Sequence, residues 1–111
     1  MSSTAQDMWR PFDDGRTIGL EGSEGGTVLL DEEHPAGARI TLESNGAVAP
    51  FAITCGIYGD MMHTRFVAKD GEARRDYALM RAALGGMLAD REARGRAAYF
   101  QGVKMFVEQF P

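Results

Sequence analysis

Short segments rich in branched and aromatic side chains alternate with turn signals between residues 16 and 68. The turn signals are the stretches "GSEGG", "HPAG", "SNG" and "YGD", which are built from residue types that favour tight turns. Short apolar runs separated in this way are typical of antiparallel strands joined by hairpins. The pattern predicts a five-stranded antiparallel meander, with strands at about residues 16–21, 26–33, 38–44, 51–58 and 61–68.

The alternation of side chains along each strand predicts which residues share a face of this sheet. Turns at Glu24-Gly25, "HPAG", Asn45-Gly46 and Gly59-Asp60, the last two with two-residue loops, would gather one apolar face. It is formed by Ile18, Leu20, Leu29, Ile40, Leu42, Phe51, Ile53, Cys55, Ile57, Met62, Thr64, Phe66 and Ala68. A three-residue loop at Gly59 would instead place Cys55 beside His63. It would also bring Arg65 onto the apolar face, where an unpaired charge is costly, so we expect the two-residue turn.

Two helices are expected after the meander, over about residues 71–94 and 97–110. The first carries an apolar stripe at helical spacing and a glycine stop at Gly95. The second is apolar over much of its circumference, which is wider than a helix with one solvated side needs. Because one long helix already spans most of such a sheet, we expect this second helix to pair with another copy of the chain through Tyr99, Phe100, Val103, Phe106, Val107 and Phe110.

The fold class expected from these elements is α+β, a five-stranded antiparallel meander followed by two C-terminal helices packed on the sheet. Residues 1–15 form an N-terminal arm whose aromatic residues, Trp9 and Phe12, would fix it to the body. Residues 16–111 are expected to form a single domain, in line with the length of 111 residues.

Charge and cysteine content narrow the class of protein. Sixteen acidic and twelve basic residues give a net charge of −4, which disfavours nucleic acid as a partner, since phosphate binding needs a positive surface. The single cysteine cannot form an internal disulfide, and the N-terminal residues resemble no signal peptide. No segment is apolar enough to span a membrane. We expect a soluble cytoplasmic protein.

The segment "CGIYGDMMHTRF", residues 55–66, is where the sequence most resembles a chemical site. Cys55, Met61, Met62 and His63 are soft-metal ligand types, but in the expected register the thiol and the imidazole lie on opposite faces. We therefore expect a hairpin with neither a metal site nor a thiol–imidazole pair. The chain contains none of the common hydrolase, metalloprotease or nucleotide-binding motifs, and no catalytic residue or cofactor is predicted.

Two functions remain open. The first is a non-catalytic interaction or regulatory module that forms homodimers or binds another protein. The alternative function is the binding of a small anionic ligand, with or without catalysis, on the mixed polar face of the sheet. The candidate ligands of the anion are Arg39, Thr54, His63 and Arg65, because guanidinium, imidazole and hydroxyl groups together bind carboxylates and phosphates.

Overall fold

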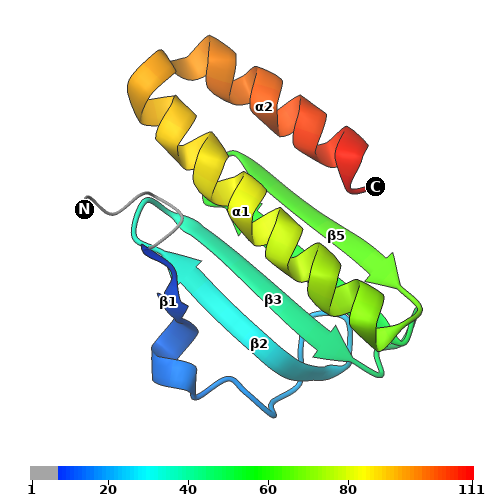
Figure 1. Cartoon of the computed structure of the whole chain (residues 1–111). Coiled ribbons are helices and arrows are strands. Elements are labelled where there is room, and N and C mark those ends of the chain that lie inside the picture. Colours follow the sequence, from blue (N-terminus) through cyan, green and yellow to red (C-terminus); the bar gives the residue numbers. More distant parts are fainter. Residues whose placement is uncertain (1–7) are drawn as a thin grey trace.

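A computed structural model of the chain describes residues 8–111. One antiparallel sheet contains β1 (Arg10–Pro11), β2 (Thr27–His34), β3 (Ala38–Ser44), β4 (Phe51–Ile57) and β5 (Met61–Val67) in chain order (Figure 1). A 3-10 turn, η2 (Phe12–Gly15), follows β1, and the helices α1 (Asp70–Arg94) and α2 (Arg96–Gln109) follow the sheet. The predicted α+β fold, a five-stranded antiparallel sheet followed by two helices packed against it, is confirmed.

The first strand is not where the sequence pattern placed it. The expected strand at 16–21 is a loop, which forms one isolated bridge to β2 between Glu21 and Thr27 and exchanges backbone hydrogen bonds with Val28. The outer partner of β2 is instead the two-residue strand β1, from the expected N-terminal arm. Gly19, with φ of +88°, takes the loop out of extended geometry. The first seven residues of that arm lie outside the described part of the chain.

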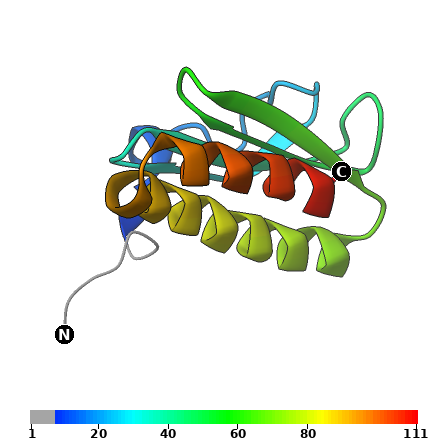
Figure 2. The same cartoon turned by 90° about the horizontal axis from the view of Figure 1, so that it is seen from above.

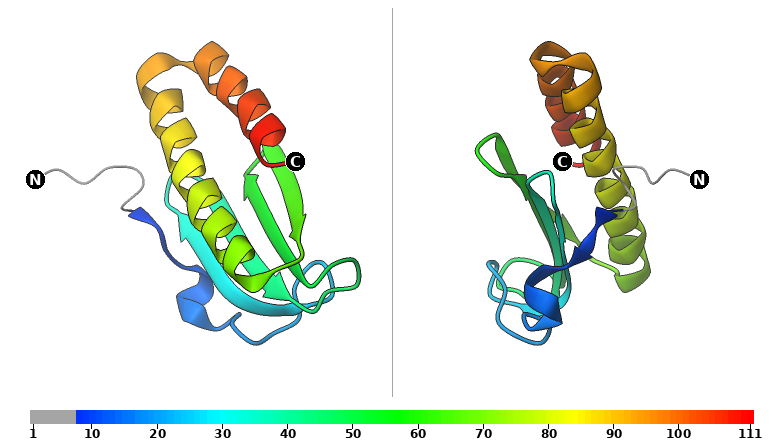
Figure 3. Two further views of the ribbon diagram at one scale, coloured as in Figure 1. Left: turned by 45° about the vertical axis from the view of Figure 1, so that its right-hand side comes forward. Right: turned by 90° about the vertical axis from the view of Figure 1, so that its left-hand side faces the viewer.

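Both helices lie on the same face of the sheet, and the loop over residues 16–26 lies on the other face (Figures 2 and 3). There is therefore room for both helices on one side, contrary to the geometric reason given for dimerisation through α2. The core between the layers includes Ile40, Leu42 and Ile53 from the sheet and Met80 and Leu84 from α1, all of them completely buried. We call the two sides the helix-covered face and the open face.

The two-residue turn expected at Asn45-Gly46 is wrong, because Ser44 pairs with Phe51 and residues 45–50 form a longer loop. The expected faces of β3 and β4 are still correct, because the shift in register is an even number of residues: Ile40 lies opposite Cys55, and Leu42 opposite Ile53, on the helix-covered face. The face expected for β5 is wrong. Cys55 lies opposite His63, and Ile57 opposite Met61, so Met62, Thr64 and Phe66 are on the open face. The connection is a three-residue loop over residues 58–60, not the expected two-residue turn at Gly59-Asp60.

The geometry of Gly59 explains this error. Asp60 donates its N–H to the carbonyl of Ile57 at 2.9 Å, and Gly59 has φ of +82°. Gly59 thus occupies the third position of a turn, where a positive φ also requires glycine. The hairpin "HPAG" is longer than expected in the same way, since His34 pairs with Ala38 and Gly37 has φ of +104°. One extra residue in a loop reverses the face of the strand beyond it.

Candidate functional site

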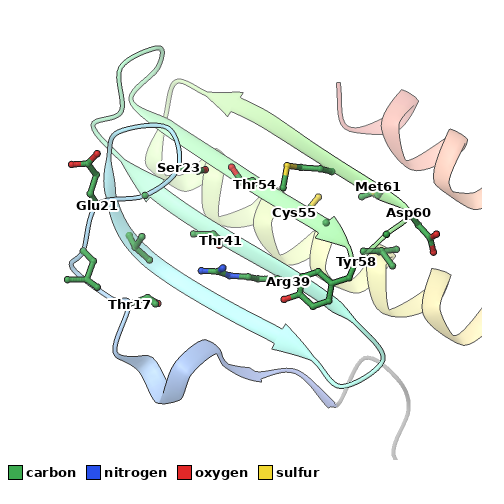
Figure 4. A pocket seen from close by; sticks show the side chains of 17 residues that line it. Thr17, Glu21, Ser23, Arg39, Thr41, Thr54, Cys55, Tyr58, Asp60 and Met61 are labelled. Atoms are coloured by element: carbon green, nitrogen blue, oxygen red, sulfur yellow. The ribbon is translucent and has the colours of Figure 1, made fainter.

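The open face carries a pocket of about 650 Å³. Its floor is formed by side chains of β3 and β4, including Arg39, Thr41 and Thr54, and its rim by Thr17 from the loop over residues 16–26 and by Tyr58 (Figure 4). The helices are on the far side of the sheet (Figure 3). The pocket is therefore a hollow in an uncovered sheet face, and strand pairing fixes the positions of its floor residues.

A buried carboxylate organises one side of this pocket. The side chain of Asp31, which is 0% exposed, accepts hydrogen bonds from Arg39 Nε at 2.9 Å and Arg39 Nη2 at 2.7 Å. It also accepts one from Thr17 Oγ1 at 2.8 Å and one from Thr41 Oγ1 at 3.1 Å. The hydrogen bond to Asp31 raises the pKa of Arg39. Asp31 therefore holds the guanidinium, the loop and the floor in fixed positions.

The guanidinium of Arg39 is also covered by an aromatic ring. Its central carbon lies 3.6 Å from the centroid of the Phe12 ring, a cation–π contact. Trp9, three residues earlier, is buried on the other side of β2, where its ring meets His34 edge-on at 5.2 Å between centroids. Residues 9–12 thus pack on both faces of the outer sheet edge, with Phe12 on the open face and Trp9 on the helix-covered face.

Hydroxyl groups form a row across the open face. Asp31, Thr41, Thr54 and Thr64 are direct cross-strand neighbours on four successive strands. The hydroxyls of Thr54 and Thr64 lie 3.3 Å apart. A line of polar groups thus runs from the buried carboxylate to the outer strand β5.

The glycine-rich stretch "EGSEGG" encloses a carboxylate of the chain itself. Glu43, buried on the open face, accepts the N–H groups of Glu24 at 3.1 Å and Gly26 at 2.8 Å. A Cβ on Gly22 would lie 2.6 Å from that carboxylate, so glycine is needed there for the close approach. The loop is closed around Glu43 and fixes one wall of the pocket.

The four residues proposed to bind an anion are not brought together. Arg39 and Thr54 lie on the open face, but His63 and Arg65 lie on the helix-covered face. Arg65 Nε donates to Asp76 of α1 at 3.0 Å, and the ring of His63 contacts the carbonyl of Phe110. The sheet itself separates the two pairs, so no single small ligand contacts all four.

Cys55 and His63 are neighbours across β4 and β5, contrary to the expected register. The cysteine is nonetheless buried in the core, where loss of solvation raises its pKa to about 12, so the thiol is a poor nucleophile at neutral pH. Within residues 8–111, no three His, Cys, Asp or Glu side chains are grouped so that they could hold a metal ion.

Most of the α2 residues proposed as an interface belong to the core instead. Tyr99, Phe106 and Phe110 are buried, and Val103 packs against the same cluster. Tyr99 donates its hydroxyl to Asp60 at 2.7 Å, and burial together with this hydrogen bond raises its pKa to about 12. The remaining two candidates, Phe100 and Val107, are each 39% exposed.

Sequence reasoning missed Asp31, whose hydrogen bonds position Thr17, Arg39 and Thr41 around the pocket. Its signal was present: "TVLLDEEH" places three consecutive acidic residues in a predicted strand, and alternation requires at least one of them to differ in face from its neighbours. Asp76 had a comparable signal. It lies three residues after Ala73 and four before Met80, on the apolar stripe of α1, where a carboxylate indicates a buried cation opposite.

No protein-family model, curated protein or solved structure matches this chain. In the described range, neither helix combines the length and the apolar character that crossing a membrane requires.

Proposed function

We propose that this protein is a non-catalytic interaction module that forms a homodimer through the free edge of β5. The observation that carries the proposal is the contrast between the two sheet edges. The outer edge of β2 pairs with β1, whereas β5 is the last strand of the sheet. Within residues 8–111, no backbone hydrogen bond outside the sheet involves β5. Its outer side offers a template for another strand.

The edge of β5 has few of the usual protections against such pairing, since its inward-pointing arginine, Arg65, is paired with Asp76. The strand is seven residues long, its sequence "MMHTRFV" contains no proline, glycine or lysine, and no bulge interrupts its pairing with β4. Proteins that remain monomeric generally block long sheet edges with these devices. An unblocked edge of this length supports pairing with a partner strand.

A second copy of the same strand is the partner that fits best. Antiparallel pairing about a twofold axis at Thr64 would place Thr64 opposite Thr64 of the second copy, and Met62 opposite Phe66 of the second copy. On the open face, Met62 is 83% exposed and Phe66 is 42% exposed. A methionine facing an aromatic ring is a favourable cross-strand pair, and the twofold axis forms it twice.

Two exposed apolar residues of α2, Phe100 and Val107, support the same surface. Gly102 of α2 faces Met87 of α1, with its Cβ position 3.4 Å from Met87 Cγ. Counted in one direction, Phe100 and Val107 lie roughly 160° and 140° around the helix from Gly102, so they point away from α1. Because α2 lies on the β5 side of α1 (Figures 1 and 2), their direction is toward the free edge. This apolar stripe would cover part of an added strand.

The chain's only cysteine supports the non-catalytic part of this proposal, since its thiol is buried and has a raised pKa. An unpaired cysteine also fits our inference of a cytoplasmic location, where thiols remain reduced. The anionic-ligand alternative receives no such support, because its four residues lie on opposite faces of the sheet.

Light scattering over about 1 to about 100 µM protein tests the dimer. We expect the mass of two chains, and two double variants test the register. In Met62→Lys/Phe66→Glu each introduced charge would face its opposite across the axis, so dimerisation persists. In Met62→Lys/Phe66→Lys like charges would face each other, so the dissociation constant rises at least about tenfold.

Leu79→Lys is the matched control, because Leu79 is also an exposed apolar residue but lies on α1. It should leave the dissociation constant unchanged. A wild-type protein that stays monomeric at the highest concentration would refute the dimer. Equal behaviour of the two double variants would refute the β5 register.

A further inference from the structure

We propose that the pocket on the open face binds an uncharged small molecule that has an apolar body and one amide-like or hydroxyl head group. The pocket shares Met62 with the proposed dimer surface, but its binding groups all belong to one chain, so it does not require the dimer. Its volume of about 650 Å³ lies within the roughly 300–1,000 Å³ typical of small-molecule sites. The chemical class follows from the charges, the hydrogen-bonding groups and the walls of the pocket.

The charges around the pocket are already compensated inside the protein. Asp31 neutralises Arg39 through two hydrogen bonds and is itself completely shielded from solvent. The carboxylate of Glu43 is bonded to loop N–H groups. An ionic ligand would therefore lose hydration without gaining an unpaired opposite charge, which is unfavourable.

The two acidic residues that line the pocket, Asp60 and Glu21, do not alter this balance. Asp60 accepts the hydroxyl of Tyr99 at 2.7 Å and lies 3.7 Å from Arg91 Nη1. Glu21 is at the rim, and its side chain points away from the floor (Figure 4). The floor of the pocket is therefore polar but has no uncompensated charge.

Hydrogen-bonding capacity remains at the Arg39 end. Arg39 uses Nε and Nη2 on Asp31, and in the described part of the chain its Nη1 makes no hydrogen bond. Thr17 and Thr41 donate their hydroxyl protons to Asp31, so their oxygens still have acceptor capacity. A head group that accepts from Nη1 and donates to a threonine oxygen satisfies both, as a primary amide or an alcohol does.

The rest of the pocket suits an apolar body. The apolar side chains of Leu20, Val28 and Met62 line the pocket, and Gly56 contributes no side chain to it. The ring of Tyr58, 61% exposed, stands at the rim and is free to stack on a flat ligand. Binding would remove these exposed apolar surfaces from water, which is the favourable term for a neutral ligand.

Three probes that share a phenyl ring and differ in charge test this proposal: benzamide, benzoate and benzylammonium. Each is titrated to about 10 mM into uniformly ¹⁵N-labelled protein, and backbone amide shifts are followed by NMR. We expect saturable shifts with benzamide, centred on Thr41, Thr54 and Gly56. Benzoate and benzylammonium should bind at least about tenfold more weakly.

Two variants and a control locate the site. Arg39→Lys keeps a cation beside Asp31 but removes Nη1, and it should weaken benzamide about threefold. Thr54→Trp fills the floor and should abolish the saturable shifts. Leu79→Ala, on α1, should change neither result, and thermal unfolding verifies that each variant is folded.

The proposal fails if benzamide gives no saturable shifts, or if either charged probe binds as tightly as benzamide. It also fails if folded Thr54→Trp binds benzamide like the wild type. None of these outcomes bears on the dimer, whose readout is the molecular mass in solution.

Discussion

The two faces of the sheet use similar residue types for different purposes. On the helix-covered face, Glu32 accepts hydrogen bonds from Tyr77 and Arg81, and Arg65 pairs with Asp76. On the open face, the buried carboxylates Asp31 and Glu43 bind parts of the loop over residues 16–26. The first set connects the helices to the sheet. The second set builds the wall of a pocket.

This difference means that stability and binding are distributed unequally between the faces. The helix-covered face contains the closely packed core, in which a lost side chain leaves a cavity. The open face contains exposed apolar residues and half-buried hydroxyls, whose replacement leaves no cavity. Substitutions should therefore separate into those that unfold the protein and those that alter only binding.

The largest expected contrast is between Leu84→Ala and Met62→Ala. Leu84, a residue of α1, is completely buried in the core, whereas Met62 is exposed on the open face. We expect the free energy of unfolding to fall by about 2–5 kcal/mol for Leu84→Ala and by less than about 0.5 kcal/mol for Met62→Ala. Urea unfolding of both variants measures this, and comparable losses would mean that the two faces do not differ as described.

A second contrast compares the buried carboxylates of the two faces. Asp31→Asn and Asp76→Asn each weaken a hydrogen-bonded arginine pair, and each should lower the free energy of unfolding by about 2 kcal/mol, less than a fully buried pair because the arginines are partly exposed. The location of the effect should differ. Hydrogen exchange should accelerate over residues 16–26 for Asp31→Asn, and in α1 and at the end of α2 for Asp76→Asn.

If exchange accelerates in the same segments for both variants, the assignment of Asp31 to the pocket wall is wrong. Thr41→Val is a useful control, because it removes a single hydroxyl donor from Asp31 and leaves the charge pair intact. Its effect on exchange should be confined to the same loop and should be smaller.

These residues also show how far sequence reasoning reaches. Alternation correctly predicted that Ile40 and Leu42 share a face of β3, because the side chains of one strand point alternately to its two faces. Ile53 of β4 is on that same face. The face of β5 depended on the length of one loop, and glycine at position 59 is compatible with either length. The cost of burying Arg65 favours the two-residue turn, but Asp76 of α1 pairs with Arg65 and offsets this cost.

The site was harder to predict than the fold for the same physical reason. The pocket depends on Asp31 meeting Thr17 and Arg39, and on Glu43 meeting Glu24, which are contacts across loops and strands. Spacing within a single element does not encode such contacts. The strand at 16–21 was overpredicted because its apolar residues satisfy strand alternation, while Gly19 adopts a positive φ.

The third prediction concerns the buried thiol of the helix-covered face. Burial raises the pKa of Cys55 from its ordinary 9.0 to about 12 in the folded protein. The unfolded chain therefore loses this proton first, so the stabilising contribution is complete below pH 9 and declines as the pH rises toward 12. Between pH 9 and pH 10 we expect a decline of about 1 kcal/mol.

Urea unfolding at pH 8, 9 and 10 measures this decline, and Cys55→Ala is the control, in which the pH dependence over this range should flatten. The measurements stop at pH 10 because Tyr99 also has a raised pKa. Its contribution to the free energy of unfolding begins to fall only above pH 10.0, the ordinary tyrosine pKa. An unchanged slope in Cys55→Ala would show that the thiol is not buried as described.

The smallest expected effect tests the register that separates the faces. Thr54 and Thr64 are paired across β4 and β5 on the open face, with hydroxyls 3.3 Å apart. A double-mutant cycle with Thr54→Val, Thr64→Val and both together should give a coupling free energy of about 0.5 kcal/mol. In the register with a two-residue turn, Thr64 would instead face the core opposite Cys55. Thr64→Val alone would then stabilise the protein by removing a buried hydroxyl, and the coupling to Thr54 would vanish, so the sign of one measurement distinguishes the two arrangements.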